Sequence, residues 1–315
     1  MRDLRIVFMG TPDFAVATLK SIIEHNYNVV GVITAPDRPA GRGRKLKASA
    51  VKEYALSKNL TVLQPTNLKD ENFIEELKGL KPNLNVVVAF RMLPKAVWDM
   101  PEYGTFNLHA SLLPDYRGAA PINWAIINGE RKTGVTTFFI DEKIDTGHII
   151  YQEEVPIEET DNAGTLHDKL MVTGAELVIH TLKGIENNTI EVKPQPKEDT
   201  FKTAYKLNRD NTKINWTNDI NTINNLIRGL SPYPSAWCEL YNKGTSQSVK
   251  IYDATPIIET HNFDTGKIIV EDSTIKVAVE KGYLILNKLQ LPGKKAMEGK
   301  ALLNGYIFYR DAKMS

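Results

Sequence analysis

Several features that are common in secreted and membrane proteins are missing from this sequence of 315 residues. It contains one cysteine, Cys238, so it cannot form an internal disulfide framework, which suits a reducing compartment. No uninterrupted apolar run reaches membrane-spanning length, and residues 4–9 have the pattern of a strand rather than of a signal peptide. We therefore expect a cytoplasmic protein with no membrane partner.

The chain also lacks an excess of charge of one sign. It has 39 lysines and arginines against 38 aspartates and glutamates. A nucleic-acid partner would therefore have to be held by a local basic patch rather than by the field of the whole protein. The length is sufficient for two domains. A polar, proline-bearing stretch at 193–199 has the chemistry of a linker, and we predict domains at 1–189 and 208–315 with a linker at 190–207.

The first half of the chain alternates strand-like and helix-like segments, which is typical of a parallel α/β sheet. A strand at 4–9 precedes an amphipathic helix at 15–24, and apolar strands follow at 84–89 and 104–109. A dinucleotide-binding domain begins in a similar way, but the turn at 10–13 lacks the G-x-G-x-x-G spacing. We therefore predict a Rossmann-like parallel sheet that does not bind a dinucleotide.

The pattern changes after residue 213, where one helix is followed by short strands separated by turns. Five short strands fit a small OB-like β-barrel, a fold that often binds nucleic acids. The predicted strands are 236–241, 249–255, 266–270, 275–279 and 283–291.

Three polar residues form the candidate catalytic site. Asn107 and His109 end a buried strand, and because strand side chains alternate between faces, both point the same way. An amide can stabilise a developing oxyanion and an imidazole can move a proton, as acyl transfer requires. Asp145, two residues before Gly147, can orient His109 and stabilise its charge. A purely structural Asn-x-His pair is the alternative that spacing alone leaves open.

Residues 35–47 combine prolines, glycines and five basic residues, which predicts a mobile, solvated loop. Solvation alone explains such a composition. Guanidinium groups also pair with phosphates and stack on bases, so the same loop has the chemistry to bind RNA.

The sequence resembles the 10-formyltetrahydrofolate-dependent formyltransferases over nearly its whole length. The resemblance is carried by HASLLP at 109–114, YRGAAPI at 116–122 and DTG at 145–147. Within the family it is strongest to the branch that acts on methionyl-tRNA, whose basic P-D-R-P-A-G-R-G loop recurs at 36–43. Segments of the C-terminal half, at 231–237 and 293–297, match the same branch.

This resemblance implies an activity. The formyl group of 10-formyltetrahydrofolate, a cosubstrate, would pass to the α-amino group of methionyl-initiator tRNA, giving formylmethionyl-tRNA for translation initiation. Asn107 and a protonated His109 would stabilise the tetrahedral oxyanion while Asp145 supports the charged imidazole. The family needs no metal, and we expect a monomer.

The resemblance also implies two binding sites. A loop that matches the family's folate-contacting loop would bind the cosubstrate, together with the loop at 90–94, which is one residue shorter than in most members and lacks their glycine. The residues expected to bind folate are Ser111, Leu112, Leu113, Pro114, Arg91, Met92 and Leu93, and those expected to contact tRNA are Arg38, Arg42, Arg44, Lys45, Lys47 and Lys206.

Two other functions stay open at this point. The enzyme could formylate a small amine, such as an amino sugar or glycinamide ribonucleotide, because the catalytic residues would be the same; the basic loop and the barrel argue against this. A noncatalytic RNA-binding protein on an inactive enzyme fold is the second alternative, and the presence of Asn107, His109 and Asp145 together argues against it.

Overall fold

The computed structural model describes residues 1–40, 45–196 and 200–315, without the side chains of residues 40 and 45. The described chain forms two compact units. The first comprises Met1–Gly118, Thr133–Pro156 and His167–Thr203, and the second comprises Ala119–Lys132, Ile157–Leu166 and Ala204–Ser315. The division at 189 and 208 stays a prediction about the linear sequence.

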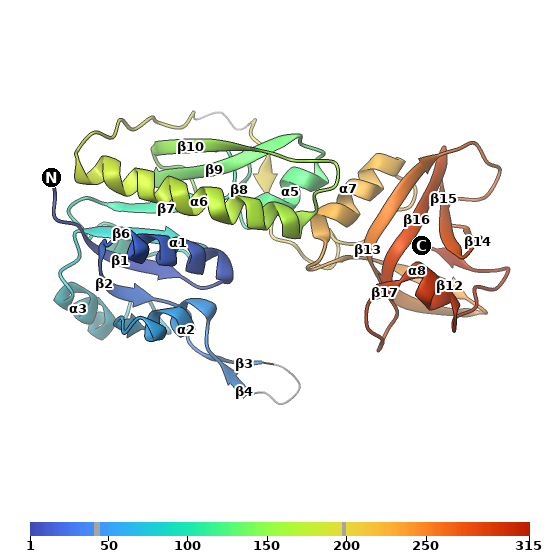
Figure 1. Ribbon diagram of the computed structural model, residues 1–315, viewed down its shortest axis with the longest axis horizontal. Helices are drawn as coiled ribbons and strands as arrows, with labels where there is room; N and C mark the ends of the chain where they lie inside the picture. The colour runs from blue at the N-terminus through green and yellow to red at the C-terminus, as the bar shows by residue number, and fades with distance from the viewer. Residues whose placement is uncertain (41–44, 197–199) are drawn as a thin grey trace. The chain divides into compact units, whose positions relative to one another are not determined.

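A seven-stranded sheet in the order β10-β9-β7-β6-β1-β2-β5 forms the centre of the first unit (Figure 1). Strand β1 pairs in parallel with β2 and β6, β2 pairs in parallel with β5, and β6 pairs in parallel with β7, whereas β9 is antiparallel to β7. The predicted parallel α/β sheet is confirmed. The strands are β1 (Arg5–Gly10), β2 (Asn28–Ile33), β5 (Val62–Leu63), β6 (Leu84–Val88), β7 (Thr105–His109), β9 (Lys132–Phe139) and β10 (Ile149–Pro156).

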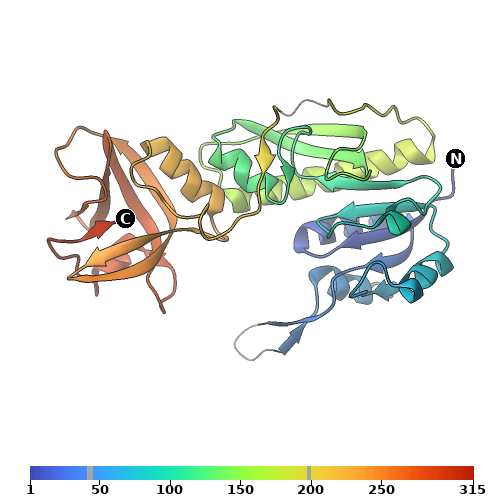
Figure 2. The ribbon, with the colours of Figure 1, turned by 180° about the vertical axis from the view of Figure 1, so that it is seen from behind.

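Helices cover both faces of this sheet. Helices α1 and α6 lie over one face (Figure 1), and α3 and α4 lie over the other (Figure 2). Val7 and Val87 share a core cluster with Phe73 of α3. On the opposite face, a Cβ added to Gly174 of α6 would lie 2.8 Å from Leu108, so a larger residue would separate α6 from β7. The helices are α1 (Asp13–Glu24), α2 (Ala50–Ser57), α3 (Glu71–Gly79), α4 (Lys95–Trp98) and α6 (Ala163–Glu186).

The loop predicted at 35–47 is wrong where two strands lie within it, whereas residues 35–37 are irregular as predicted. Strands β3 (Arg38–Ala40) and β4 (Lys45–Lys47) form an antiparallel pair there. Proline is tolerated in such an isolated edge pair because only one side of each strand needs ladder hydrogen bonds. Asp37, just before β3, accepts hydrogen bonds from Lys52 Nζ at 2.7 Å and from Gln64 Nε2 at 2.9 Å, which fixes the start of the β3–β4 pair. Composition indicated a loop because prolines and glycines are as common in hairpins as in irregular segments.

A curled antiparallel sheet forms the second unit, in the order β14-β15-β16-β13-β12-β18, with β17 beside β16. A bridge between Lys267 and Lys313 brings the two ends of this order together, as expected for the predicted OB-like fold, which is confirmed. Prediction missed the two shortest strands. The strands are β12 (Ala236–Asn242), β13 (Thr245–Ile258), β14 (Ile268–Glu271), β15 (Thr274–Val279), β16 (Gly282–Gln290), β17 (Met297–Glu298) and β18 (Lys313–Met314).

The core of the second unit includes Cys238, and burial raises the pKa of this thiol to about 12. Helix α7 (Ile220–Leu230) packs against β13 and against α5 (Pro121–Ile127). A Cβ on Gly229 would lie 2.6 Å from Ile127, so this glycine allows the two helices to approach closely. Helix α8 (Gly299–Leu303) completes the unit. None of the helices in the ranges described above has both the length and the apolarity needed to cross a bilayer.

Candidate active site

The candidate site lies at the carboxyl end of β7. In open α/β sheets, ligands bind beyond the carboxyl ends of the strands, near the point where the strand order reverses. Here the order reverses between β1 and β6, and β7 is the next strand. Phe106 and Leu108 are buried, Asn107 is half-buried, and His109 is 6% exposed at the strand end. Alternation along β7 places Asn107 and His109 on the face opposite Leu108, as the sequence predicted.

Two neighbours fix the ring of His109. Its Nε2 lies 2.8 Å from the carbonyl oxygen of Tyr116, and because a carbonyl can only accept, Nε2 carries a proton. Its Nδ1 lies 3.9 Å from Oδ2 of Asp145. In the neutral ring, Nδ1 therefore has the lone pair and is the atom that can accept a proton. A proton accepted at Nδ1 would produce an imidazolium beside a carboxylate.

Asp145 has an unusual backbone conformation. Its φ of 55° lies in the left-handed region, which aspartate tolerates better than most residues. Its Oδ2 accepts a hydrogen bond of 2.9 Å from the backbone N–H of Gly118, and its side chain is only 17% exposed. A Cβ on Gly147 would lie 1.7 Å from the carbonyl oxygen of Phe139, so the turn after Asp145 requires glycine for close packing.

Asn107 keeps its side-chain amide free. Within the described residues, no protein atom hydrogen-bonds to this amide. Asn85 on the neighbouring β6 differs, because its amide donates to Val97 O and to Thr105 Oγ1, both at 3.2 Å. The Asn107 amide is thus available to donate to a bound molecule, whereas the Asn85 amide is used within the protein, connecting β6 to Val97 and Thr105.

The loop expected to bind folate is divided between structural and accessible residues. Ser111 and Leu113 are buried. The N–H of Leu113 donates to Thr136 Oγ1 at 3.2 Å, and its carbonyl accepts from Gln152 Nε2 at 2.9 Å. The polar backbone atoms of Leu113 therefore already have partners in the protein. The half-buried Leu112 and Pro114 are left as the contact surface.

The loop at 90–94 is divided in the same way. The Arg91 guanidinium donates to the carbonyls of Thr66, at 2.9 Å, and of Pro65. Desolvation and then the nearby charge of Arg38 lower the pKa of Arg91. Leu93 packs in the core, while the side chain of Met92 is 70% exposed. Arg91 thus holds this loop against the segment that contains Pro65 and Thr66. Met92 is the exposed side chain of the loop that can contact a ligand. The role of all seven residues in folate binding stays a prediction.

The expected tRNA-contacting residues are on the surface where the structure describes them. Arg38 and Lys47 are exposed on the β3–β4 hairpin and are directly paired in its register, and Lys206 is exposed in the second unit. Leu46, beside Lys47, is 72% exposed. Arg42 and Arg44 lie outside the described residues, as does the side chain of Lys45. Contact with tRNA stays a prediction for all six.

One residue of the site had no signal in the sequence. Gln195, inside the predicted linker, donates from Nε2 to the carbonyls of Asp145 at 3.0 Å and Gly147 at 2.8 Å. Its Oε1 accepts two hydrogen bonds from Arg117, from Nε at 3.1 Å and from a terminal nitrogen at 2.6 Å. A glutamine between two prolines has no distinguishing pattern, and its partners are 50 and 78 residues away.

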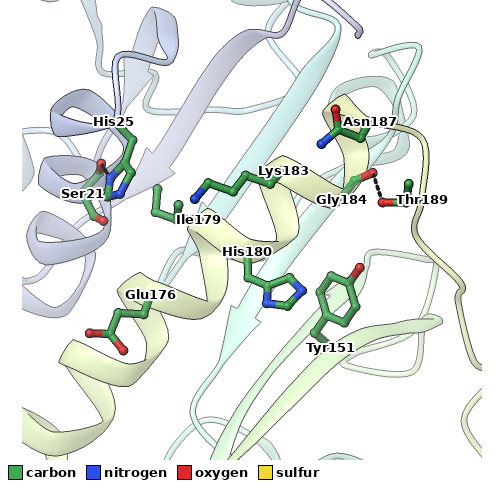
Figure 3. A pocket seen from close by; sticks show the side chains of 10 residues that line it. All are labelled: Ser21, His25, Tyr151, Glu176, Ile179, His180, Lys183, Gly184, Asn187 and Thr189. Carbon is green, nitrogen blue, oxygen red and sulfur yellow. Dashed lines mark hydrogen bonds between the residues drawn. The ribbon is translucent and has the colours of Figure 1, made fainter.

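A groove of the first unit contains none of the predicted site residues. It has a volume of about 420 Å³ and lies between α1, β10 and α6 (Figure 3). The rings of His180 and Tyr151 meet there with centroids 4.4 Å apart. No group of three or more histidine, cysteine, aspartate or glutamate side chains able to hold a metal ion occurs among residues 1–40, 45–196 and 200–315.

Known proteins resemble this chain over its full length. The family model "Formyl transferase" matches residues 4–182, and the model "Formyl transferase, C-terminal domain" matches residues 206–307. A methionyl-tRNA formyltransferase of Flavobacterium johnsoniae is 62% identical over 314 residues, which cover 100% of both chains. A protein of the same name from Bacteroides thetaiotaomicron is 51% identical over 320 residues, 99% of each chain.

Among solved structures, an N-formyltransferase from Helicobacter canadensis, crystallised with folinic acid and dTDP-3-aminofucose, has a TM-score of 0.64. It is 22% identical, and the match covers 90% of this chain and 98% of that chain. At this identity the likeness concerns the fold.

Proposed function

The chain belongs to the formyl transferase family, and we propose that it transfers the formyl group of 10-formyltetrahydrofolate to the α-amino group of methionyl-initiator tRNA. The observation that carries this proposal is the 62% identity to a methionyl-tRNA formyltransferase across the whole chain, the C-terminal domain included. The product would be formylmethionyl-tRNA, which starts translation. We infer that the protein acts in the cytoplasm as a monomer.

The geometry of the first unit suits this chemistry. An α-amino group titrates near pH 7.7–8.0, so a useful fraction is an uncharged nucleophile at neutral pH. When the amine attacks the formyl carbon, charge develops on the formyl oxygen, and the free amide of Asn107 is a donor for that charge. The attacking nitrogen must lose a proton, and Nδ1 of His109 is the lone pair available to take it.

Asp145 supports this step electrostatically. Its carboxylate lies 3.9 Å from Nδ1 and is held by Gly118, so the imidazolium formed at His109 has a fixed counter-charge. Nε2 of His109 is bound to Tyr116, so a charged His109 can donate to the oxyanion only through Nδ1. The oxyanion stabilisation predicted for His109 is therefore limited to this one atom. The proton can later leave from the same atom toward the folate nitrogen.

The apolar residues near the site fit the donor. Leu112, Pro114 and Met92 offer accessible apolar surface, and small-molecule sites are lined largely by such groups. Binding of the acceptor is assigned to the basic hairpin, where Arg38 and Lys47 lie side by side, and to the second unit with Lys206. Their phosphate contacts would make affinity fall with salt.

The test is a transfer assay with three acceptors. The purified protein is incubated with 10-formyltetrahydrofolate and, separately, with methionyl-initiator tRNA, unacylated tRNA or free methionine. The amino acid is then released from the tRNA by hydrolysis, and formylmethionine is identified by mass spectrometry. Formylmethionine from the charged tRNA alone is the expected result.

Two outcomes would contradict the proposal. When a nucleotide-linked amino sugar and glycinamide ribonucleotide are added as further acceptors, transfer to either of them, with none to methionyl-tRNA, would establish the small-amine alternative. Binding of tRNA by the folded protein without transfer to any acceptor would point to the noncatalytic alternative.

A further inference from the structure

We propose that Gln195 is a positioning residue of the active site, which holds Asp145 in place for His109. The inference rests on the proposed formyl transfer, because the effect of Gln195 would appear in that reaction. Gln195 belongs to a segment that we call the strap, residues 193–196 and 200–203, which lies in the predicted linker and is part of the first unit.

Every hydrogen-bonding group of the Gln195 side chain is used. The amide nitrogen donates to the carbonyls of Asp145 and Gly147, which anchors both ends of the D-T-G turn. The amide oxygen accepts from the guanidinium of Arg117. Arg117 immediately precedes Gly118, whose N–H binds the carboxylate of Asp145. Gln195 therefore connects the backbone of Asp145 to the segment that holds its side chain.

This connection matters because the turn is not in a favoured conformation. Asp145 has a φ of 55°, and a residue other than glycine adopts the left-handed region only when its surroundings hold it there. The two bonds from Gln195 flank the residue Thr146 and close the turn from the strap side. Without these two hydrogen bonds, the Asp145 carboxylate would be held mainly by one hydrogen bond, from the N–H of Gly118.

The same strap also holds the other neighbour of His109. The N–H of Tyr116 donates to the carbonyl of Lys202 at 2.5 Å, and the N–H of Lys202 donates to Asp115 Oδ1 at 3.0 Å. The carbonyl of Tyr116 is the acceptor that fixes Nε2 of His109. The guanidinium of Arg117 also lies 5.5 Å from the ring centre of Phe201. Both groups that orient the imidazole are thus anchored to the strap.

The strap itself is fixed to the sheet. Lys193 and Ile149, at the start of β10, exchange two backbone hydrogen bonds of 2.8 Å. Gln195 follows two residues later, so its reach toward Asp145 is set by this bridge. The position of Asp145 is therefore determined by a chain of backbone and side-chain contacts that starts on the central sheet.

The experiment compares Gln195→Ala and Gln195→Glu with the wild type. The glutamate variant has nearly the same shape and can still accept from Arg117, but it cannot donate to Asp145 and Gly147. Small displacements of a reacting group can cost about 100-fold in rate. We expect both variants to lower the single-turnover rate of formyl transfer by about 10- to 100-fold, with the KM for methionyl-tRNA within about twofold of the wild type.

The matched control is Gln290→Ala in the second unit. Gln290 also bridges two partners, donating to the carbonyl of Lys294 at 2.7 Å and accepting from the Tyr252 hydroxyl at 2.7 Å. A general loss of stability would affect this variant as well, whereas a positioning role is confined to Gln195. Thermal midpoints of all variants are measured, and rates are taken well below the lowest midpoint.

The outcomes separate the two proposals. A slow chemical step in both Gln195 variants, with an unchanged KM and a normal control, supports the positioning role. Wild-type rates in Gln195→Glu, or an effect on KM alone, would overturn it. An inactive wild type would instead remove the proposed function, whatever the variants do.

Discussion

The candidate site around His109 and the β3–β4 hairpin differ in how tightly the protein holds them. Around His109, the ring, the carboxylate of Asp145 and the loop at Leu113 each have hydrogen-bond partners in the protein, and His109 is almost fully buried. On the hairpin, Arg38 and Lys47 are exposed, and the firm anchor is Asp37 at its base.

The difference fits the roles proposed for the two regions. Formyl transfer needs reacting atoms held within a fraction of an ångström, and this requires groups that are fixed before substrate arrives. Long cationic side chains can reach the phosphates of an RNA backbone from many positions. These side chains stay hydrated until the RNA binds. Substitutions at the His109 site should therefore affect the rate of formyl transfer. Substitutions on the hairpin should affect the affinity for tRNA and the salt dependence of that affinity.

The largest effect is expected from His109→Ala. General acid–base catalysis contributes about 100- to 10,000-fold, so kcat for formyl transfer should fall by that range. Removing the ring also removes its hydrogen bond to the Tyr116 carbonyl, which should cost about 0.5–1.5 kcal/mol in the free energy of unfolding. Rates come from single-turnover assays and stability from urea denaturation. A kcat within tenfold of the wild type would exclude His109 as the proton acceptor.

Asn107→Ala should separate rate from stability more cleanly. Loss of one oxyanion donor costs about 100- to 1,000-fold in rate. The Asn107 amide has no partner among the described residues, so the thermal midpoint should change little. Asn85→Ala is a useful contrast, because that buried amide has two partners and its loss should lower the midpoint. A wild-type rate in the Asn107 variant would remove this residue from the mechanism.

A smaller effect is expected from the double variant Arg38→Ala/Lys47→Ala. Each lost phosphate contact lowers the salt dependence of tRNA affinity by a slope of about 1, so KM for methionyl-tRNA should rise severalfold with kcat nearly unchanged. Lys69→Ala, an exposed lysine outside the hairpin, is the control. Transfer is measured between about 50 and 200 mM salt. An unchanged salt slope would show that these two side chains do not meet phosphates.

The smallest effect concerns the anchor of the hairpin. Hydrogen bonds from Gln64 and then from Lys52 lower the pKa of Asp37. Because the folded pKa lies below the unfolded value of about 3.9, the stabilisation is present above that pH and is lost as pH falls through the folded pKa.

The difference in thermal midpoint between the wild type and Asp37→Asn tests this directly. It should be constant from pH 8 to about pH 5 and should shrink below about pH 4. A difference that persists at lower pH would mean that it does not come from the charge of Asp37.

Around His109, the sequence predicted the elements better than their connections. Strand β7 and the direction of Asn107 and His109 followed from apolar alternation, which the structure preserves. The helix expected at 15–24 is α1, which runs from Asp13 to Glu24. Periodicity is a local signal, and local signals suffice where burial on one face decides the structure.

The connections could not be predicted because they join distant residues. Gln195 contacts Asp145 across 50 residues, and Arg91 reaches Thr66 across 25. The left-handed backbone of Asp145 has no signature in the letters D-T-G, because the close contact between Gly147 and Phe139 becomes visible only in three dimensions. The burial of Ser111 and Leu113 likewise depends on Thr136 and Gln152, which come from other strands.

The strap has a consequence for how this enzyme can be divided or recombined. A fragment ending at residue 189, where the sequence places the domain boundary, would contain Asn107, His109 and Asp145 but would lack Gln195 and Lys202. Such a fragment would have every reacting group and an unsupported imidazole. Chimeras that exchange the C-terminal domain should therefore keep residues up to 203 with their own catalytic half. The strap lies between the predicted domains in the sequence, but its contacts make it part of the candidate active site.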